Sequence, residues 1–152
     1  MTTAVSTGDT APALTLTTTD GSFTLPPEGK RGVILFFYPK DNTPGCTTEA
    51  KAFSALKSEF DAKGFDIVGV SRDSMKSHEN FTTKQDLTIP LASDEDGTVC
   101  EAFGVWVEKK MYGRTFMGIE RATFAIGSDG TILECWRKVR VKGHAEAVLS
   151  IL

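Results

Sequence analysis

The order of apolar and polar residues predicts strands that alternate with helices. The short, continuous apolar run at 33–38 (VILFFY) is typical of a strand buried on both faces, and the second run, 65–71 (FDIVGVS), is expected to be the next buried strand. After the first run, apolar side chains recur at helical spacing, which predicts a helix over roughly 46–62 that Gly64 ends. A polar helix over 74–85 follows the second run. This strand-helix alternation favours an α/β fold.

The rest of the chain predicts shorter elements. The segment ALTLTTTDGSFTL has two strand-like halves around Asp20-Gly21, which predicts an N-terminal β-hairpin. In chain order we then expect a short strand and turn in 88–94, a short helix over 97–104, a less regular segment around 106–117, two strands over 121–126 and 131–139 around a Ser128-Asp129-Gly130 turn, and a last helix over 143–152. The predicted architecture is a central mixed β-sheet flanked by helices, in a single domain spanning 1–152.

Composition and charge exclude several classes of protein. The chain has 152 residues, is 40% hydrophobic and 24% charged, and carries a net charge of −3, so we expect no general attraction to nucleic acid or to anionic membranes. The run at 33–38 is too short to span a bilayer. The N-terminal sequence MTTAVSTGDTAP has neither a basic start nor an apolar stretch, so no secretory signal is expected and we predict a cytoplasmic location.

Cysteine and histidine are too few and too scattered for a structural metal site or a disulfide framework. Cys46, Cys100 and Cys135 are widely spaced and odd in number, and only His78 and His144 accompany them. We expect His78 to face solvent, because it lies among charged neighbours on a polar helix, and His144 to begin the last helix. Neither supplies a base for a cysteine protease.

Cys46 is the candidate for chemistry, because of its position in FFYPKDNTPGCTTEAKAF. Pro39 ends the first buried strand, a polar loop follows, and Cys46 comes at the predicted start of a helix, beyond the carboxyl end of the strand where α/β proteins place their sites. A helix N-terminus favours the thiolate, which is the form that attacks. Thr43 can present its hydroxyl there, and Arg121 is a candidate cation from a later strand.

A lone cysteine is most often a small buried hydrophobe, and this interpretation applies differently to the three thiols. A loop rich in proline and glycine is a poor place to bury a side chain, so we expect Cys46 to be accessible. Cys100 lies in a short apolar helix and Cys135 lies in a strand beside Trp136. We interpret both as structural residues.

The run YPKDNTPGCTTEA resembles the active-site signature of the peroxiredoxins, Pro-x-x-x-Thr-x-x-Cys. The segments DTAPALTLTTTDG and GVWVEKKMYGRTFMGIERATFAIGSDGTI are similar to those of the Q-type peroxiredoxins, also called bacterioferritin comigratory proteins. The resemblance covers nearly the whole chain. It implies a thioredoxin-like fold and a thiol peroxidase that reduces hydrogen peroxide and organic hydroperoxides without metal, haem or flavin.

The resemblance also implies a role for each matching residue. Cys46 would be the peroxidatic cysteine, which peroxide converts to a sulfenic acid. Thr43 would hydrogen-bond the peroxide and the thiolate, Pro39 would shield the site, and Arg121 would be the active-site arginine. Glu49 matches the residue usual three positions after the cysteine and would have a supporting role.

The chain departs from the Q-type pattern at the resolving cysteine. Many members have it five residues after the first, where this chain has Lys51, and others have it in the next helix, where residues 74–85 contain no cysteine. Either an external thiol (thioredoxin, glutaredoxin or glutathione) reduces Cys46, or Cys100 or Cys135 resolves it after local unfolding, or two chains pair through Cys46. We favour the first, because the other two thiols have core-like settings.

Two other functions compete with a peroxidase. A thioredoxin-like disulfide exchanger is disfavoured, because Thr43 stands where a second cysteine would be needed. A redox sensor or holdase that signals through oxidised Cys46 without turnover is the alternative from a different class. For the assembly we expect a monomer or a weak homodimer.

Overall fold

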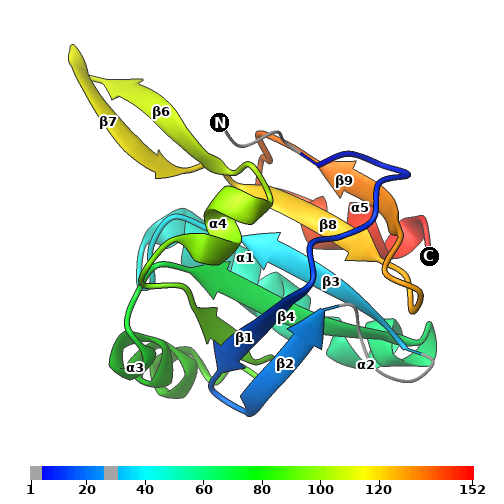
Figure 1. Cartoon of the computed structure of the whole chain (residues 1–152). Coiled ribbons are helices and arrows are strands. Elements are labelled where there is room, and N and C mark those ends of the chain that lie inside the picture. The colour runs from blue at the N-terminus through cyan, green and yellow to red at the C-terminus, as the bar shows by residue number, and fades with distance from the viewer. Residues whose placement is uncertain (1–4, 26–30) are drawn as a thin grey trace.

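The computed structural model describes residues 5–25 and 31–152 and is shown in Figure 1. Within these residues, seven strands form one mixed sheet in the order β2-β1-β5-β4-β3-β8-β9. These strands are β1 (Leu14–Thr18), β2 (Gly21–Leu25), β3 (Gly32–Phe37), β4 (Phe65–Ser71), β5 (Leu91–Ser93), β8 (Ala122–Ile126) and β9 (Ile132–Trp136). The helices are α1 (Pro44–Ala55), α2 (Lys57–Ala62), α3 (Met75–Gln85), α4 (Thr98–Ala102) and α5 (His144–Ser150). The fold is therefore the predicted mixed sheet flanked by helices, with its N-terminal hairpin β1–β2.

The pairing of β3 determines what meets at one end of the sheet. β3 runs parallel to β4 and antiparallel to β8, with Phe37 opposite Ala122. Arg121 precedes Ala122 and therefore lies just beyond the carboxyl end of β3, the end from which the chain continues into α1. Two segments about 75 residues apart in sequence, those of Cys46 and Arg121, thus reach the same edge.

The side chains of β3 alternate between two apolar cores. Val33, Leu35 and Phe37 face the core on the α4 side of the sheet. Ile34 and Phe36, and Tyr38 just after the strand, face the core that contains residues of α1, α2, α3 and α5. Figure 1 shows α4 on one face of the sheet and α1 and α5 behind the other. Burial on both faces explains why the run at 33–38 is continuously apolar.

The helix predicted over 46–62 is two helices. α1 begins earlier, at Pro44, because proline at the first helical position sacrifices no hydrogen bond. The N–H of Leu56 is shared between the carbonyls of Ala52 and Phe53, each at 3.2 Å, and the chain then starts α2. The turn lets Phe60 pack against Phe53, with ring centroids 5.8 Å apart. Helical spacing alone did not reveal this break.

The segment around 106–117, predicted to be less regular, is a β-hairpin. β6 (Trp106–Met111) and β7 (Arg114–Ile119) pair antiparallel as a separate two-stranded sheet. Tyr112 and Gly113 form the turn with φ angles of 53° and 75°, the left-handed pair that two-residue hairpins require. Figure 1 shows this hairpin extending away from the main sheet. The prediction failed because tyrosine rarely takes the first left-handed position.

Two further observations complete the fold. The strand predicted over 131–139 ends at Trp136. Among residues 5–25 and 31–152, every helix is too short or too polar to cross a lipid bilayer.

Candidate active site

Cys46 lies in the first turn of α1, at the carboxyl end of β3. Thr43 caps the helix without a side-chain hydrogen bond, and the first intrahelical bond runs from the N–H of Thr47 to the carbonyl of Thr43, at 2.9 Å. The N–H groups of Gly45 and Cys46 precede this bond and have no acceptor within the helix. They supply donors and partial positive charge beside the sulfur.

Arg121 joins Cys46 to Glu49. Its Nη2 donates a hydrogen bond to the Cys46 sulfur at 3.3 Å, and its Nη1 donates to Oε1 of Glu49 at 2.6 Å. Burial acts to lower the pKa of Arg121, but the charges of Glu49 and Cys46 outweigh it and raise the pKa above its ordinary value. The structure therefore places a permanently charged guanidinium on the thiol, as the sequence suggested for Arg121.

Glu49 is almost fully buried beneath this guanidinium. Its side chain is 1% exposed, and its Oε2 has no hydrogen-bond partner in the described part of the chain. Burial raises the pKa of Glu49 to about 7, although the positive charge of Arg121 opposes the shift. A carboxyl group that titrates near neutrality is thus attached to the candidate site.

Thr43 and Pro39 belong to the segment between β3 and Cys46, and the described structure shows no hydrogen bond from either side chain to the sulfur. The Thr43 hydroxyl donates to the carbonyl of Lys40 at 2.8 Å, which leaves its oxygen as an acceptor. Pro39 is exposed and lines a groove of about 490 Å³. Trp106, Phe116 and Met117 of the β6–β7 hairpin line the same groove, together with Lys109 and others. These three apolar side chains are therefore beside Pro39, whereas Met111 and Tyr112 lie at the hairpin tip.

The expectation that Cys46 is accessible was wrong. Its side chain is 1% exposed, and it belongs to the core on the α1 side of the sheet. The loop before it is tightly held, and Arg121 covers the sulfur, so the glycine and proline that suggested exposure instead allow close packing. The thiol is buried beside a charge, not in a purely apolar interior.

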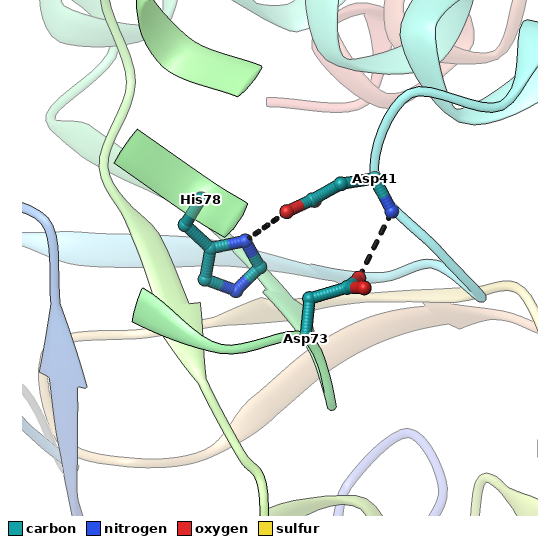
Figure 2. Close-up of side chains that lie close together, drawn as sticks. All are labelled: Asp41, Asp73 and His78. Carbon is teal, nitrogen blue, oxygen red and sulfur yellow. Dashed lines mark hydrogen bonds and ion pairs between the residues drawn. The ribbon is translucent and has the colours of Figure 1, made fainter. Parts of the chain in front are cut away.

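His78 was expected to face solvent, and this too was wrong. It is fully buried, and its Nδ1 lies 2.7 Å from Oδ2 of Asp41 (Figure 2). Its Nε2 lies 2.9 Å from the carbonyl of Ala92. Oδ1 of Asp41 accepts from Tyr38 at 2.6 Å, and Oδ2 also accepts from Ser77. The polar sequence of α3 concealed this single inward-facing histidine.

The Asp41 network holds the loop that follows β3. The N–H of Asp41 donates to Oδ2 of Asp73 at 2.9 Å, so that both the backbone and the side chain of Asp41 are fixed (Figure 2). The next residue, Asn42, has a left-handed φ of 61°. Asp41, Asp73 and His78 lie close enough together to bind a metal ion, but every polar side-chain atom of Asp41 and His78 already has a hydrogen-bond partner. Their geometry is that of a network that positions Pro39 and Thr43.

The other two cysteines belong to a different core from Cys46. Cys100 is fully buried on α4, and burial together with the charge of Asp94 raises its pKa well above the ordinary value. Cys135 is half-buried on β9 and packs against the core on the α4 side of the sheet. All three are free thiols. The sheet lies between Cys46 and the other two, in agreement with their interpretation as structural residues.

The chain is similar to a well-defined group of proteins. Residues 7–135 match the AhpC/TSA family. Peroxiredoxin Bcp of Xanthomonas campestris is 55% identical over 120 residues, which are 79% of this chain and 75% of that protein. Putative peroxiredoxin bcp of Coxiella burnetii is 44% identical over 95% of this chain and 97% of its own.

Solved structures of Q-type peroxiredoxins show the same similarity. A cysteine-to-serine mutant of Xylella fastidiosa PrxQ superposes with a TM-score of 0.92 at 44% identity, covering 98% of this chain and 96% of that one. A mutant of X. campestris peroxiredoxin Q superposes with a TM-score of 0.88 at 47% identity, covering 95% and 97%. With a cysteine on a helix N-terminus beneath an arginine, in a thioredoxin-like fold, this chain belongs to the AhpC/TSA family as a peroxiredoxin of the Q (bacterioferritin comigratory protein) group, and it is a thiol peroxidase.

Proposed function

We propose that the protein reduces hydrogen peroxide and organic hydroperoxides through a sulfenic acid on Cys46, and that an external thiol regenerates the cysteine. The observation that carries the proposal is the 3.3 Å hydrogen bond from Arg121 to the Cys46 sulfur at the N-terminus of α1. A solved structure of the X. campestris bacterioferritin comigratory protein concerns its alkyl peroxide reduction activity. We extend this substrate class to the present chain.

The groups around Cys46 fit an in-line displacement. The thiolate attacks one peroxide oxygen, the O–O bond breaks, and the second oxygen leaves with the electron pair. Arg121 and the N–H groups of Gly45 and Cys46 stabilise the developing negative charge, and the Thr43 oxygen accepts a hydrogen bond from the peroxide. Pro39 excludes water from the loop side. Because Cys46 is buried, peroxide enters after a small displacement of this loop.

A one-cysteine cycle is supported by the positions of the other side chains. The position five residues after Cys46, where many Q-type members have the resolving cysteine, is occupied by Lys51, which is exposed on α1. Two solved cysteine-to-serine mutants of X. campestris peroxiredoxin Q change two cysteines that are 36 residues apart in that sequence. The residue 36 positions after Cys46 in the present chain is Thr82 of α3, which has a hydroxyl in place of a thiol. Cys100 and Cys135 lie on the α4 side of the sheet, so a disulfide with Cys46 would require large unfolding.

The proposed cycle leaves the reductant and the assembly as predictions. Thioredoxin, glutaredoxin and glutathione are the candidate reductants, because a sulfenic acid without an internal partner must react with an outside thiol. A monomer or weak homodimer in the cytoplasm remains our expectation.

Mass analysis after one equivalent of peroxide tests the proposal. The wild type and the Cys100→Ser and Cys135→Ser variants should each gain one oxygen on Cys46, and Cys46→Ser should gain none. A disulfide that contains Cys100 or Cys135 would overturn the one-cysteine cycle. If thioredoxin, glutaredoxin and glutathione all fail to restore the thiol, the protein is a sensor of peroxide and not a turning-over peroxidase.

A further inference from the structure

Two acidic side chains share one guanidinium at the site. Cys46 and Glu49 lie three residues apart on α1 and therefore on the same face of the helix. Arg121 donates Nη2 to the sulfur and Nη1 to the carboxylate. Both Cys46 and Glu49 are 1% exposed, and Arg121 is 17% exposed at its side chain. If both were ionised, the buried group would carry one uncompensated negative charge.

The remaining oxygen of Glu49 indicates where a proton belongs. Oε2 is buried and has no hydrogen-bond partner within the described residues. A buried carboxylate oxygen without a partner is costly, whereas a neutral carboxylic acid in the same place costs much less. The structure therefore accommodates the thiolate best when Glu49 is protonated.

The other titratable groups near the site do not neutralise the second negative charge that would arise if Cys46 and Glu49 were both ionised. His144 of α5 is neutral at pH 7, because burial and the nearby charge of Arg121 lower its pKa to about 4. Tyr38, the residue after β3, is neutral as well, since burial raises its pKa. Lys109 of β6 is half-buried in the groove beside Pro39 and forms neither a hydrogen bond nor an ion pair with Cys46 or Glu49 in the described structure. Arg121 is the cation in contact with both acids.

We propose that Glu49 is the proton reservoir of the peroxidase: it holds the proton that Cys46 gives up on becoming the thiolate, and it releases this proton to the oxygen that leaves the peroxide. The inference rests on the proposed role of Cys46. It assigns to Glu49 a chemical task in place of a merely supporting one.

Charge and electrons balance in each state. Before reaction the site holds a thiolate, a carboxylic acid and a guanidinium, with a net charge of zero. The sulfur forms a bond to one peroxide oxygen, the O–O bond breaks, and the leaving alkoxide or hydroxide takes the proton of Glu49 to become an alcohol or water. The sulfur is oxidised by two electrons and the peroxide is reduced by two. Afterwards a neutral sulfenic acid, a carboxylate and a guanidinium again sum to zero, so no step leaves a buried charge unpaired.

Infrared difference spectroscopy of the whole protein tests the proton directly. Reduced wild type at neutral pH should show the carbonyl band of a protonated carboxylic acid, which one equivalent of hydrogen peroxide converts to carboxylate bands. Glu49→Gln keeps an oxygen for Arg121 but should lack both signals. Cys46→Ser removes the competing anion, so its carboxylic acid band should titrate at least about one pH unit lower than in reduced wild type.

A pH-rate profile gives a second readout that a merely structural role would not change. Oxidation of Cys46 in wild type should slow on the alkaline side as Glu49 loses its proton, and Glu49→Gln should lack this limb.

Each contrary outcome has a distinct meaning. Glu49 is not the reservoir if the carboxylic acid band of the reduced protein is absent, if it persists after oxidation, or if it titrates at the same pH in Cys46→Ser. The comparison with Cys46→Ser decides the question even if the Glu49→Gln variant does not fold. If peroxide leaves Cys46 unoxidised, the proposed function itself fails.

Discussion

The guanidinium of Arg121 passes over Gly45 so closely that a side chain there would touch it: a β-carbon built on Gly45 would lie 3.3 Å from Nη2 of Arg121. This is tighter than an ordinary carbon-nitrogen contact, and the same nitrogen holds the Cys46 sulfur. Glycine in the first turn of α1 therefore serves the contact between Arg121 and Cys46 more than the conformation of the helix.

Gly45→Ala should separate folding from chemistry. Alanine is the better helix former by about 0.5–1 kcal/mol, so the free energy of unfolding should rise or stay constant. Displacement of Arg121 should slow oxidation of Cys46 by roughly tenfold, about 1.4 kcal/mol of transition-state free energy. Denaturant unfolding and stopped-flow oxidation of the same sample measure both. Unchanged kinetics would show that Nη2 can shift without cost.

Arg121→Ala should slow oxidation of Cys46 by roughly 10²–10³-fold, because it removes the donor that faces the developing charge. Arg121→Lys should be nearly as slow, since one ammonium cannot donate in two fixed directions to Cys46 and Glu49. Arg137→Ala is the matched control, because Arg137 is a similarly shielded arginine bonded to Glu120. If Cys46 is oxidised at equal rates in the Arg121→Ala and Arg137→Ala variants, Arg121 has no role in the oxidation step.

Thr43→Val should lower the oxidation rate by roughly a hundredfold while preserving shape. The Thr43 hydroxyl donates its proton to the carbonyl of Lys40, so in the proposed mechanism its oxygen accepts a hydrogen bond from peroxide. Thr48→Val changes an exposed hydroxyl of α1 that bonds only the carbonyl of Pro44 and should have no effect. Second-order rates with hydrogen peroxide provide the comparison, and a Thr43→Val variant as fast as wild type would assign Thr43 to the loop alone.

His78→Phe should destabilise the protein by about 1–3 kcal/mol, because it leaves an oxygen of the buried Asp41 side chain without its hydrogen bond to His78. Glu79→Ala, at the exposed neighbour on α3, should change the free energy of unfolding by less than about 0.5 kcal/mol. Chemical denaturation of both variants gives the values. A small effect of His78→Phe would mean that the hydrogen bond between His78 and Asp41 contributes little to stability.

Stability should depend on pH through His144. Burial and the charge of Arg121 lower the pKa of His144 from 6.5 to about 4, so between these values the unfolded chain binds a proton that the folded chain does not. Stability from this group is complete above pH 6.5 and is lost as the pH falls toward 4, an effect on the order of 2–3 kcal/mol.

Glu49 opposes this trend, because its raised pKa makes its contribution decline as the pH rises from 4.5 to about 7. The effect of His144 must therefore be isolated by difference. The unfolding free energy of wild type minus that of His144→Gln should grow steadily from pH 4 to 6.5 and stay constant above. A difference that is flat across this range would contradict a neutral buried His144.

The main strands and helices could be predicted from sequence, because each depends on local patterns. The apolar run at 33–38 predicted a strand buried on both faces, and the turn between β1 and β2 predicted a hairpin. The β6–β7 hairpin was missed because Tyr112 hides its turn. The break at Leu56 was missed because the apolar spacing continues through it.

The site was predicted only in part, because local sequence patterns do not show which distant segments pack together. Cys46 could be named from its loop and helix, and Arg121 from family resemblance and strand order. The burial of Cys46 and the Asp41–His78 pair were missed, because both arise where α1, α3 and the loop after β3 press together.

The sequence by itself therefore determined the strands, the thiol and the helix end that polarises it, since these are set by neighbours within a few positions along the chain. Only the tertiary structure decided that Arg121 reaches over Gly45 to hold both Cys46 and Glu49. The pairing of Phe37 with Ala122 brings these residues together, and a contact made by strand register leaves no mark on either segment alone.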